Sequence, residues 1–235
     1  MDSWNRETVN LGAFVNGKTI VRIDLGYDQP ANTGGYRGYI DDLSIAQANS
    51  PLNNAGISDD SNQGSASFDT SGFSYSAEAL AAKGYTPGAT VSVNGFSYVW
   101  PNVASGLNDN VVASGQTIQV TGKAGASQLS FLGSSTNGPS TGTLTITYTD
   151  GTTQTATIGF TDWTLNGGGA ALSYSNIVAC TMTYRNSSSG TSQQITTDVF
   201  ATTPIALNTS KQIASITLPA SVNQGLIHIF TWSIS

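Results

Sequence analysis

Charged residues are scarce in this 235-residue chain, because Asp, Glu, Lys and Arg together make up only 9% of it, against roughly 25% of an ordinary globular domain. The eight Lys and Arg residues are not clustered, so nucleic-acid binding has no electrostatic basis. No run approaches the ~18 consecutive apolar residues that a membrane span requires. We therefore expect neither a nucleic acid nor a membrane as a partner.

Residues for nucleophilic and metal chemistry are nearly absent. The chain has one cysteine, Cys180, and one histidine, His228, which excludes an internal disulfide and the usual zinc sites. No GxSxG elbow accompanies His228, and its strand is apolar on both faces, so we expect a buried structural histidine. Cys180 has no base or cation among its neighbours to activate a thiol, and we expect it to be a buried apolar residue.

Short alternating segments separated by Gly, Pro and Asn fill most of the chain. This pattern predicts an all-β fold, a β-sandwich or jelly roll with one short helix. Asn94-Gly95 and Asp150-Gly151 each separate two such segments and predict hairpins. From residue 89 onward, the expected strands are Thr90–Val93, Phe96–Trp100, Thr117–Thr121, Gln128–Leu132, Thr143–Thr149, Thr152–Phe160, Asn176–Tyr184, Gln193–Ala201, Gln212–Leu218 and Leu226–Ile234.

Residues 1–48 read as a separate short β unit. Thr19–Tyr27 and Tyr39–Ile45 are its expected strands, and residues 49–52 read as a linker. Two sequence segments resemble the last strands of jelly-roll accessory modules in secreted bacterial hydrolases: WNRETVNLGAFVNGKTIVRIDLGYD and the later GYRGYIDDLSI. The resemblance implies a truncated module. Because two or three strands cannot bury both faces, they would pack on the remaining chain or pair with a second copy in a homodimer.

An acidic loop and a short helix open the second unit, residues 53–235. Asp59, Asp60, Asn62 and Asp69 are hard oxygen ligands in a Gly/Ser-rich loop and could hold Ca²⁺; the alternative is that they cap local turns. Ser76 is the expected N-cap of a helix that ends at Gly84, with Glu78 in its first turn.

Four aromatic residues are candidates for a sugar-binding platform: Tyr85, Tyr98, Trp100 and Trp163. Phe96, Tyr98 and Trp100 share one face of their strand, which favours the core as their place. Trp163 stands at a strand end beside a Gly-rich loop and is the better candidate for contact with a ligand.

Carboxylates that could serve a glycosidase are few. Such chemistry needs two carboxyl groups roughly 5–10 Å apart across a cleft. Asp69, Asp162 and Asp198 are the remaining candidates, and nothing in their spacing pairs them. We assign no catalytic residue.

Three motifs carry a family likeness across residues 53–234: NNAGISDDSN…SFDTSGFSYSAEALAAKGYTPG, LTITYTDGTTQTATIGFTDWTL and IASITLPASVNQGLIHIF. Together they resemble the accessory β-sandwich modules, similar to galactose-binding jelly rolls, of secreted bacterial glycoside hydrolases and some peptidases. The resemblance implies an extracellular, non-catalytic, carbohydrate-binding-like module attached to a hydrolase domain in the same polypeptide, with a polysaccharide or glycan as its partner. It also lends support to Asp59, Asp60 and Asp69 as calcium ligands.

Two other functions stay open. The chain could be a structural spacer or assembly module without a ligand, or a glycan-active enzyme of unfamiliar type that uses Asp carboxylates.

Overall fold

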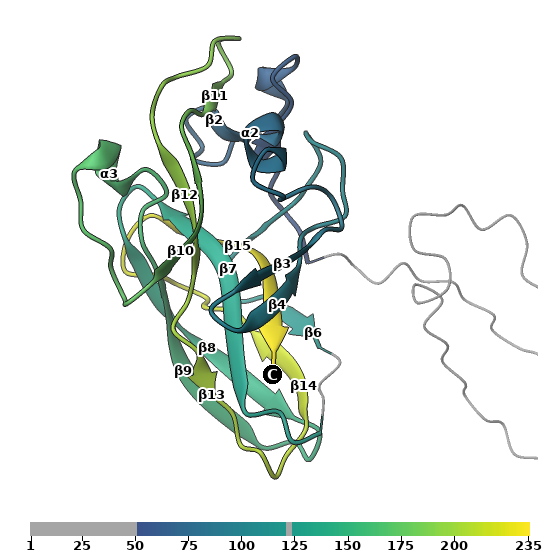
Figure 1. The fold of residues 1–235 in the computed structure, drawn as a ribbon. Helices are drawn as coiled ribbons and strands as arrows, with labels where there is room; N and C mark the ends of the chain where they lie inside the picture. Colours follow the sequence, from purple (N-terminus) through teal and green to yellow (C-terminus); the bar gives the residue numbers. More distant parts are fainter. Residues whose placement is uncertain (1–50, 121–123) are drawn as a thin grey trace, which may run out of the picture. The chain divides into compact units, whose positions relative to one another are not determined.

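A computed structural model describes residues 51–120 and 124–235, which form a β-sandwich with two short helical segments (Figure 1). The all-β prediction is therefore confirmed. The expected strands and homodimer contacts of residues 1–48 lie outside the described residues. No helix in the described ranges is long and apolar enough to cross a membrane.

A six-stranded sheet lies at the centre of the described part. Its order is β10 (Ile177–Met182), β12 (Thr197–Ala201), β7 (Gln128–Thr136), β15 (Leu226–Ile234) and β5 (Val111–Val112), and β13 (Ile205–Ala206) also pairs with β7. All of these pairs are antiparallel. Every residue of β12 and all but the first of β7 are buried, so the middle of this sheet is covered on both faces.

One face packs on a four-stranded sheet. That sheet has the order β6 (Thr117–Gln119), β14 (Ile213–Thr217), β8 (Ser140–Tyr148) and β9 (Thr153–Phe160). Alternate residues such as Leu144 and Ile146 of β8 meet Phe131 and Ile229 of the larger sheet in one apolar core. This is the sandwich that the period-two patterning predicted.

The other face carries a second, more aromatic core. The hairpin of β3 (Thr90–Val93) and β4 (Phe96–Val99) lies over it, and the Tyr98 hydroxyl donates to Ser130 Oγ of β7 at 2.7 Å. Tyr75, Trp100, Trp163 and Phe230 complete this core. The predicted inward face of Phe96, Tyr98 and Trp100 is confirmed.

A bulge in β15 interrupts the alternation of its two faces. Strict alternation places Phe230 and Trp232 on the same face, but the register shifts between Ile229 and Thr231. Phe230 packs in the aromatic core, whereas Trp232 and Ile234 pack against the core of the sandwich. A bulge adds one residue to a strand and reverses the faces of those that follow.

Both predicted hairpins are present, with different turns. Asn94 and Gly95 both have positive φ, 49° and 80°, as a two-residue type I′ turn requires. In the β8–β9 hairpin only Gly151 has positive φ, and the Gly151 amide donates to the Tyr148 carbonyl. This is the longer turn in which Gly takes the left-handed position.

At one end of the sandwich a small sheet of β1 (Ile57–Ser58), β2 (Phe73–Ser76) and β11 (Asn186–Ser187) sits beside helix α2 (Ala77–Ala81), as Figure 1 shows. A single 3₁₀ turn, η1 (Gln63–Ser65), lies in the preceding loop. Ser76 caps α2 as predicted, because its Oγ accepts a hydrogen bond from the Ala79 amide at 3.0 Å. The helix is shorter than predicted and ends before Gly84, whose φ is 88°.

Candidate functional site

A polar pocket of about 440 Å³ opens at the end of the sandwich that carries the small sheet and the helical segment α3 (Leu165–Gly168). Its walls come from turns that are distant in sequence. Carboxylate, guanidinium and amide side chains dominate them: Asp69, Asp162, Arg185, Asn137, Asn166 and Gln224, together with Trp163.

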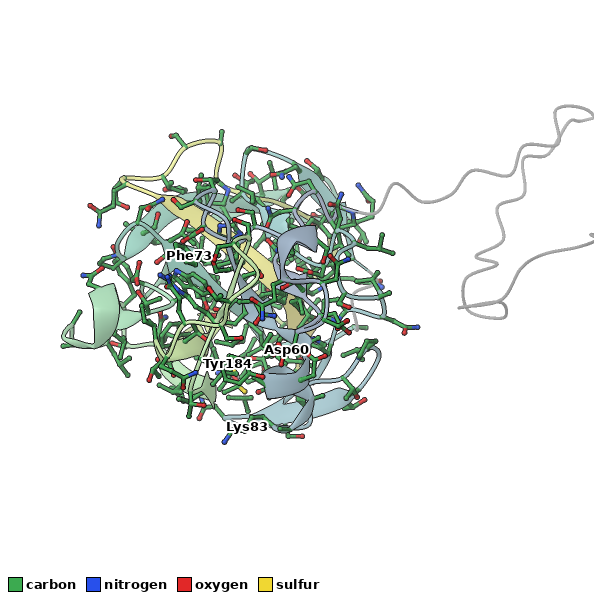
Figure 2. The ribbon with its side chains drawn as sticks, turned by 90° about the horizontal axis from the view of Figure 1, so that it is seen from above. Asp60, Phe73, Lys83 and Tyr184 are labelled. Carbon is green, nitrogen blue, oxygen red and sulfur yellow. The ribbon has the colours of Figure 1, made fainter. Side chains whose placement is uncertain are left out.

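Arg185 is the cation of this pocket, and its position is tightly specified. Its guanidinium lies 3.7 Å from the centre of the Phe73 ring and 5.3 Å from that of Trp163. Nε and Nη2 both donate to Gln193 Oε1, at 3.1 and 2.9 Å, and Nη1 lies 3.8 Å from Asp69 Oδ2. The side chain is only 12% exposed. Figure 2 looks onto this end of the molecule, with Phe73 labelled.

Burial and charge act on Arg185 in opposite directions. Burial lowers the pKa of the guanidinium below its ordinary value, and the nearby carboxylates of Asp69 and Asp162 partly restore it. An arginine remains protonated under such conditions. The pocket therefore holds one fixed positive charge, and acidic groups surround it.

Asp162 joins two turns at the rim. Its Oδ2 accepts from the Gly138 amide at 2.9 Å. Its Oδ1 accepts from the Thr164 amide at 2.9 Å, the Thr164 hydroxyl at 2.7 Å and the Asn166 amide at 3.1 Å. Because Gly138 belongs to the β7–β8 turn and Asn166 to α3, one buried carboxylate fixes both turns.

The segment α3 is a left-handed turn. Leu165, Asn166, Gly167 and Gly168 have φ values of 52°, 52°, 83° and 100°. Thr164 Oγ1 accepts from the Gly167 amide, and the Gly168 amide donates to the Thr164 carbonyl. Glycine adopts this conformation freely, whereas a residue such as Leu165 carries a cost of about 1–3 kcal/mol. Strain of this kind is concentrated at functional sites.

The predicted aromatic platform residues are largely internal. Tyr98 is 0% exposed, Trp100 and Trp163 are 2% exposed, and Tyr85 is 6% exposed. Tyr85 and Trp100 meet edge to face, and the Tyr85 hydroxyl donates to the Ala179 carbonyl. A sugar-stacking platform needs a ring face open to solvent, so Tyr85, Tyr98 and Trp100 act in packing. Of the four, only Trp163 lines the pocket.

The three aspartates among the predicted calcium ligands each accept hydrogen bonds from protein groups, and Asp59 and Asp60 both lie beside Glu78. Asp59 accepts from the Ser61 amide and hydroxyl. Asp69 accepts from the amides of Ser71 and Phe73. Asn62 only precedes η1 and makes no side-chain cap. Within the described ranges, no three His, Cys, Asp or Glu side chains gather as a metal-binding group.

Asp60 belongs to a hydrogen-bond network rather than to the pocket. It accepts from the Tyr184 hydroxyl at 2.7 Å and from Asn186 Nδ2 at 2.9 Å, and Figure 2 shows Asp60 and Tyr184 close to each other. Partial burial tends to raise the pKa of Asp60, but hydrogen bonds from Ser76, Tyr184 and Asn186 outweigh it and lower the pKa. This arrangement satisfies the carboxylate with protein donors.

Of the three candidate catalytic carboxylates, the structure brings two together. Asp69 and Asp162 both line the pocket, and Asp198 does not. Asp198 is buried, accepts from the Thr181 hydroxyl, and has a pKa raised by burial. The contacts of Asp69 and Asp162 described above orient backbone and Arg185, which is a structural use of both groups.

Sequence reasoning missed Asn137, Asn166, Arg185 and Gln224. The signals available were Asn137-Gly138-Pro139 and Asn166 followed by three glycines, both of which mark turns. A turn signal does not say which turns meet in space, and Arg185 follows β10 without any motif. The fold alone brings these residues to one pocket.

Comparison with known proteins supports the architecture. No curated protein matches the chain significantly. Residues 44–235 match the family described as the AziU2-like beta-sandwich domain. This match covers most of the chain and agrees with the sandwich described above, so the chain belongs to the AziU2-like β-sandwich domain family.

Proposed function

We propose that this chain is a non-catalytic, carbohydrate-binding-like module of a secreted bacterial hydrolase, and that it binds a glycan in the pocket around Arg185. The observation that supports this function is the lining of the pocket. Amide and guanidinium groups on a rigid sandwich end are the groups that hydrogen-bond sugar hydroxyls, and binding sites of this kind combine a few placed polar groups with a preformed concavity.

Catalysis of glycan hydrolysis at the same pocket is less well supported. A glycosidase needs one carboxyl group free to give a proton and another free to act as base or nucleophile. Asp162 accepts four hydrogen bonds, and Asp69 accepts two backbone amides beside Arg185. Because these contacts already occupy the carboxylate oxygens with protein donors, neither group is free for proton transfer, and the pocket is suited to binding without turnover.

The resemblance of the sequence to hydrolase-associated modules supplies the remaining parts of the proposal. These are an extracellular location, a catalytic domain in the same polypeptide and a polysaccharide partner. Calcium is an expected ion of such modules, and two of its expected ligands, Asp59 and Asp60, do not line the pocket. We therefore derive no role for calcium in binding.

Affinity electrophoresis of the full chain through gels that contain single soluble polysaccharides tests the proposal. We expect at least one polysaccharide to retard the chain, with no new reducing ends after long incubation. Retardation by none of a broad panel would contradict binding. Released reducing ends that disappear in Asp69→Asn or Asp162→Asn would instead favour the enzyme.

A further inference from the structure

Two asparagines stand at matching places on the rim of the pocket. Asn137 lies in the β7–β8 turn and Asn166 in α3, with φ of 58° and 52°. The same carboxylate, Asp162, holds both turns through the Gly138 and Asn166 amides. The two asparagines are therefore presented by a common support, although they are far apart in sequence.

Both side chains are exposed, and neither amide group makes a hydrogen bond to any other described residue. Asn137 and Asn166 contribute backbone geometry that glycine would provide with less strain. What asparagine adds at these positions is an amide with two donors and a two-lone-pair acceptor. Such groups match sugar hydroxyls, which both donate and accept.

The charges around the rim select against acidic ligands. Asp69 and Asp162 contribute two negative charges and Arg185 one positive charge, so the ionisable groups that line the pocket sum to −1. Arg185 is already engaged with Asp69 and Gln193. An acidic sugar would meet like charge in a partly desolvated site, which disfavours binding.

We infer that the side chains of Asn137 and Asn166 contact the ligand in this pocket, and that the ligand is an uncharged sugar. This inference rests on the proposed function, and it adds the residues that make the contact and the charge class of the glycan. Asp162 is a positioning residue, because it sets both turns without being needed for contact with the sugar.

Asn→Gly variants separate ligand contact from backbone support. Asn137→Gly and Asn166→Gly keep the left-handed conformation and remove the amide. Asn94→Gly is the matched control, since Asn94 is also exposed with positive φ, 49°, but lies in the β3–β4 hairpin outside the pocket lining. We expect all three variants to melt at or slightly above the wild-type temperature.

Affinity electrophoresis of the full chain on neutral galactan, xylan and dextran, and on acidic polygalacturonate and alginate, gives the dissociation constants. We expect retardation by a neutral polysaccharide, a loss of at least fivefold in affinity for each pocket variant, and a change of less than twofold for Asn94→Gly. Equal retardation of the wild type and the Asn137→Gly/Asn166→Gly double variant would overturn the assignment of the two residues while leaving the proposed function intact.

Three further outcomes are decisive. Retardation by acidic polysaccharides alone would overturn the charge class, again without affecting the proposed function. Retardation of the wild type by none of the five would overturn the proposed function and this inference together. A melting temperature that falls in either pocket variant, with affinity unchanged, would assign the asparagines to folding.

Discussion

His228 Nδ1 lies 2.9 Å from Asn110 Oδ1 in the interior, where both side chains are 0% exposed. Asn110 Nδ2 in turn donates to Asp109 Oδ1 at 2.7 Å, and Asp109 accepts from the Gly56 and Ile57 amides. This chain of contacts joins β15 to the segment that leads into β1. It explains why the one histidine of the protein is structural.

The contributions of His228 and Asp109 to the free energy of unfolding should change with pH in opposite directions. Burial lowers the pKa of His228 to about 3, so its contribution to stability is present above its ordinary pKa and is lost as pH falls. Burial raises the pKa of Asp109 to about 7, so its contribution is present below its ordinary pKa and is lost as pH rises. For each group, the slope of the free energy of unfolding against pH approaches ~1.4 kcal/mol per pH unit between its two pKa values.

Between pH 4 and 6.5 the two slopes oppose each other, and we expect little pH dependence from this pair in the wild type. In Asp109→Asn the free energy of unfolding should rise with pH, because only the His228 slope remains. In His228→Gln it should fall with pH. Urea unfolding at half-unit pH steps measures these slopes, and parallel pH profiles for the wild type and both variants would contradict the assignment.

Asp162→Asn should loosen both turns of the pocket rim. An asparagine at this position has only one acceptor oxygen. Its amide nitrogen is a donor and would face the N–H donors of one of the two turns, so the hydrogen bonds to that turn would be lost. We expect a loss of about 2–3 kcal/mol, since hydrogen bonds to a charged group are worth about 1.5–3 kcal/mol. Denaturant unfolding gives the loss, and amide chemical shifts should change mainly around residues 137–139 and 164–168.

Asp150→Asn is the control for Asp162→Asn. Asp150 also accepts from a backbone amide and a hydroxyl two residues later, those of Thr152, but it is exposed in the β8–β9 turn and pairs with Lys211 at 2.9 Å. An exposed ion pair of this kind is screened by solvent and contributes little to stability. A loss at Asp162 no larger than that at Asp150 would show that the rim does not depend on the carboxylate.

Gly133→Ala should be among the most damaging single substitutions in the sheet. A Cβ atom at this position of β7 would lie 2.1 Å from the His228 carbonyl oxygen and 2.8 Å from Phe160 Cζ. Backbone atoms of β15 would have to move, so we expect a loss of at least about 3 kcal/mol. Soluble yield and thermal unfolding provide the measurement.

Gly95→Ala gives the comparison for Gly133→Ala. Gly95 has φ of 80° and no atom within 4 Å of an added Cβ, so only backbone strain of about 1–2 kcal/mol applies. If the two variants lost the same stability, close packing at Gly133 would not be the cause.

Local chemistry made much of the fold predictable. Asn94-Gly95 specifies its turn by the need for positive φ, and Ser76 specifies the start of α2 by a side-chain cap. These features depend on residues within a few positions of each other. The inward placement of Trp100 also followed from alternation on one strand.

Features set by tertiary contact could not be predicted in the same way. The bulge at Phe230 cannot be recognised in the sequence. The residues around it are apolar or β-branched, so the strand would look the same with or without an extra residue. The pocket depends on which turns meet in space, and the contacts of Asp162 with residues 138 and 166 require the folded arrangement of β7, β8 and β9. Trp163 lines the pocket, but its burial among Phe68 and Tyr75 depends on residues that are distant in sequence.

Calcium removal tests the acidic loop directly. Asp59, Asp60 and Asp69 each accept hydrogen bonds from protein donors, so these carboxylates have partners without an ion. We therefore expect the same melting temperature, within about 1 °C, in EDTA and in excess CaCl₂, with NaCl used to match ionic strength. A rise of several degrees with Ca²⁺ would support the predicted site, because an ion that binds only the folded state adds to its stability. Asp59→Asn and Asp60→Asn would then abolish the rise, whereas Asp150→Asn, outside the loop, would leave it unchanged.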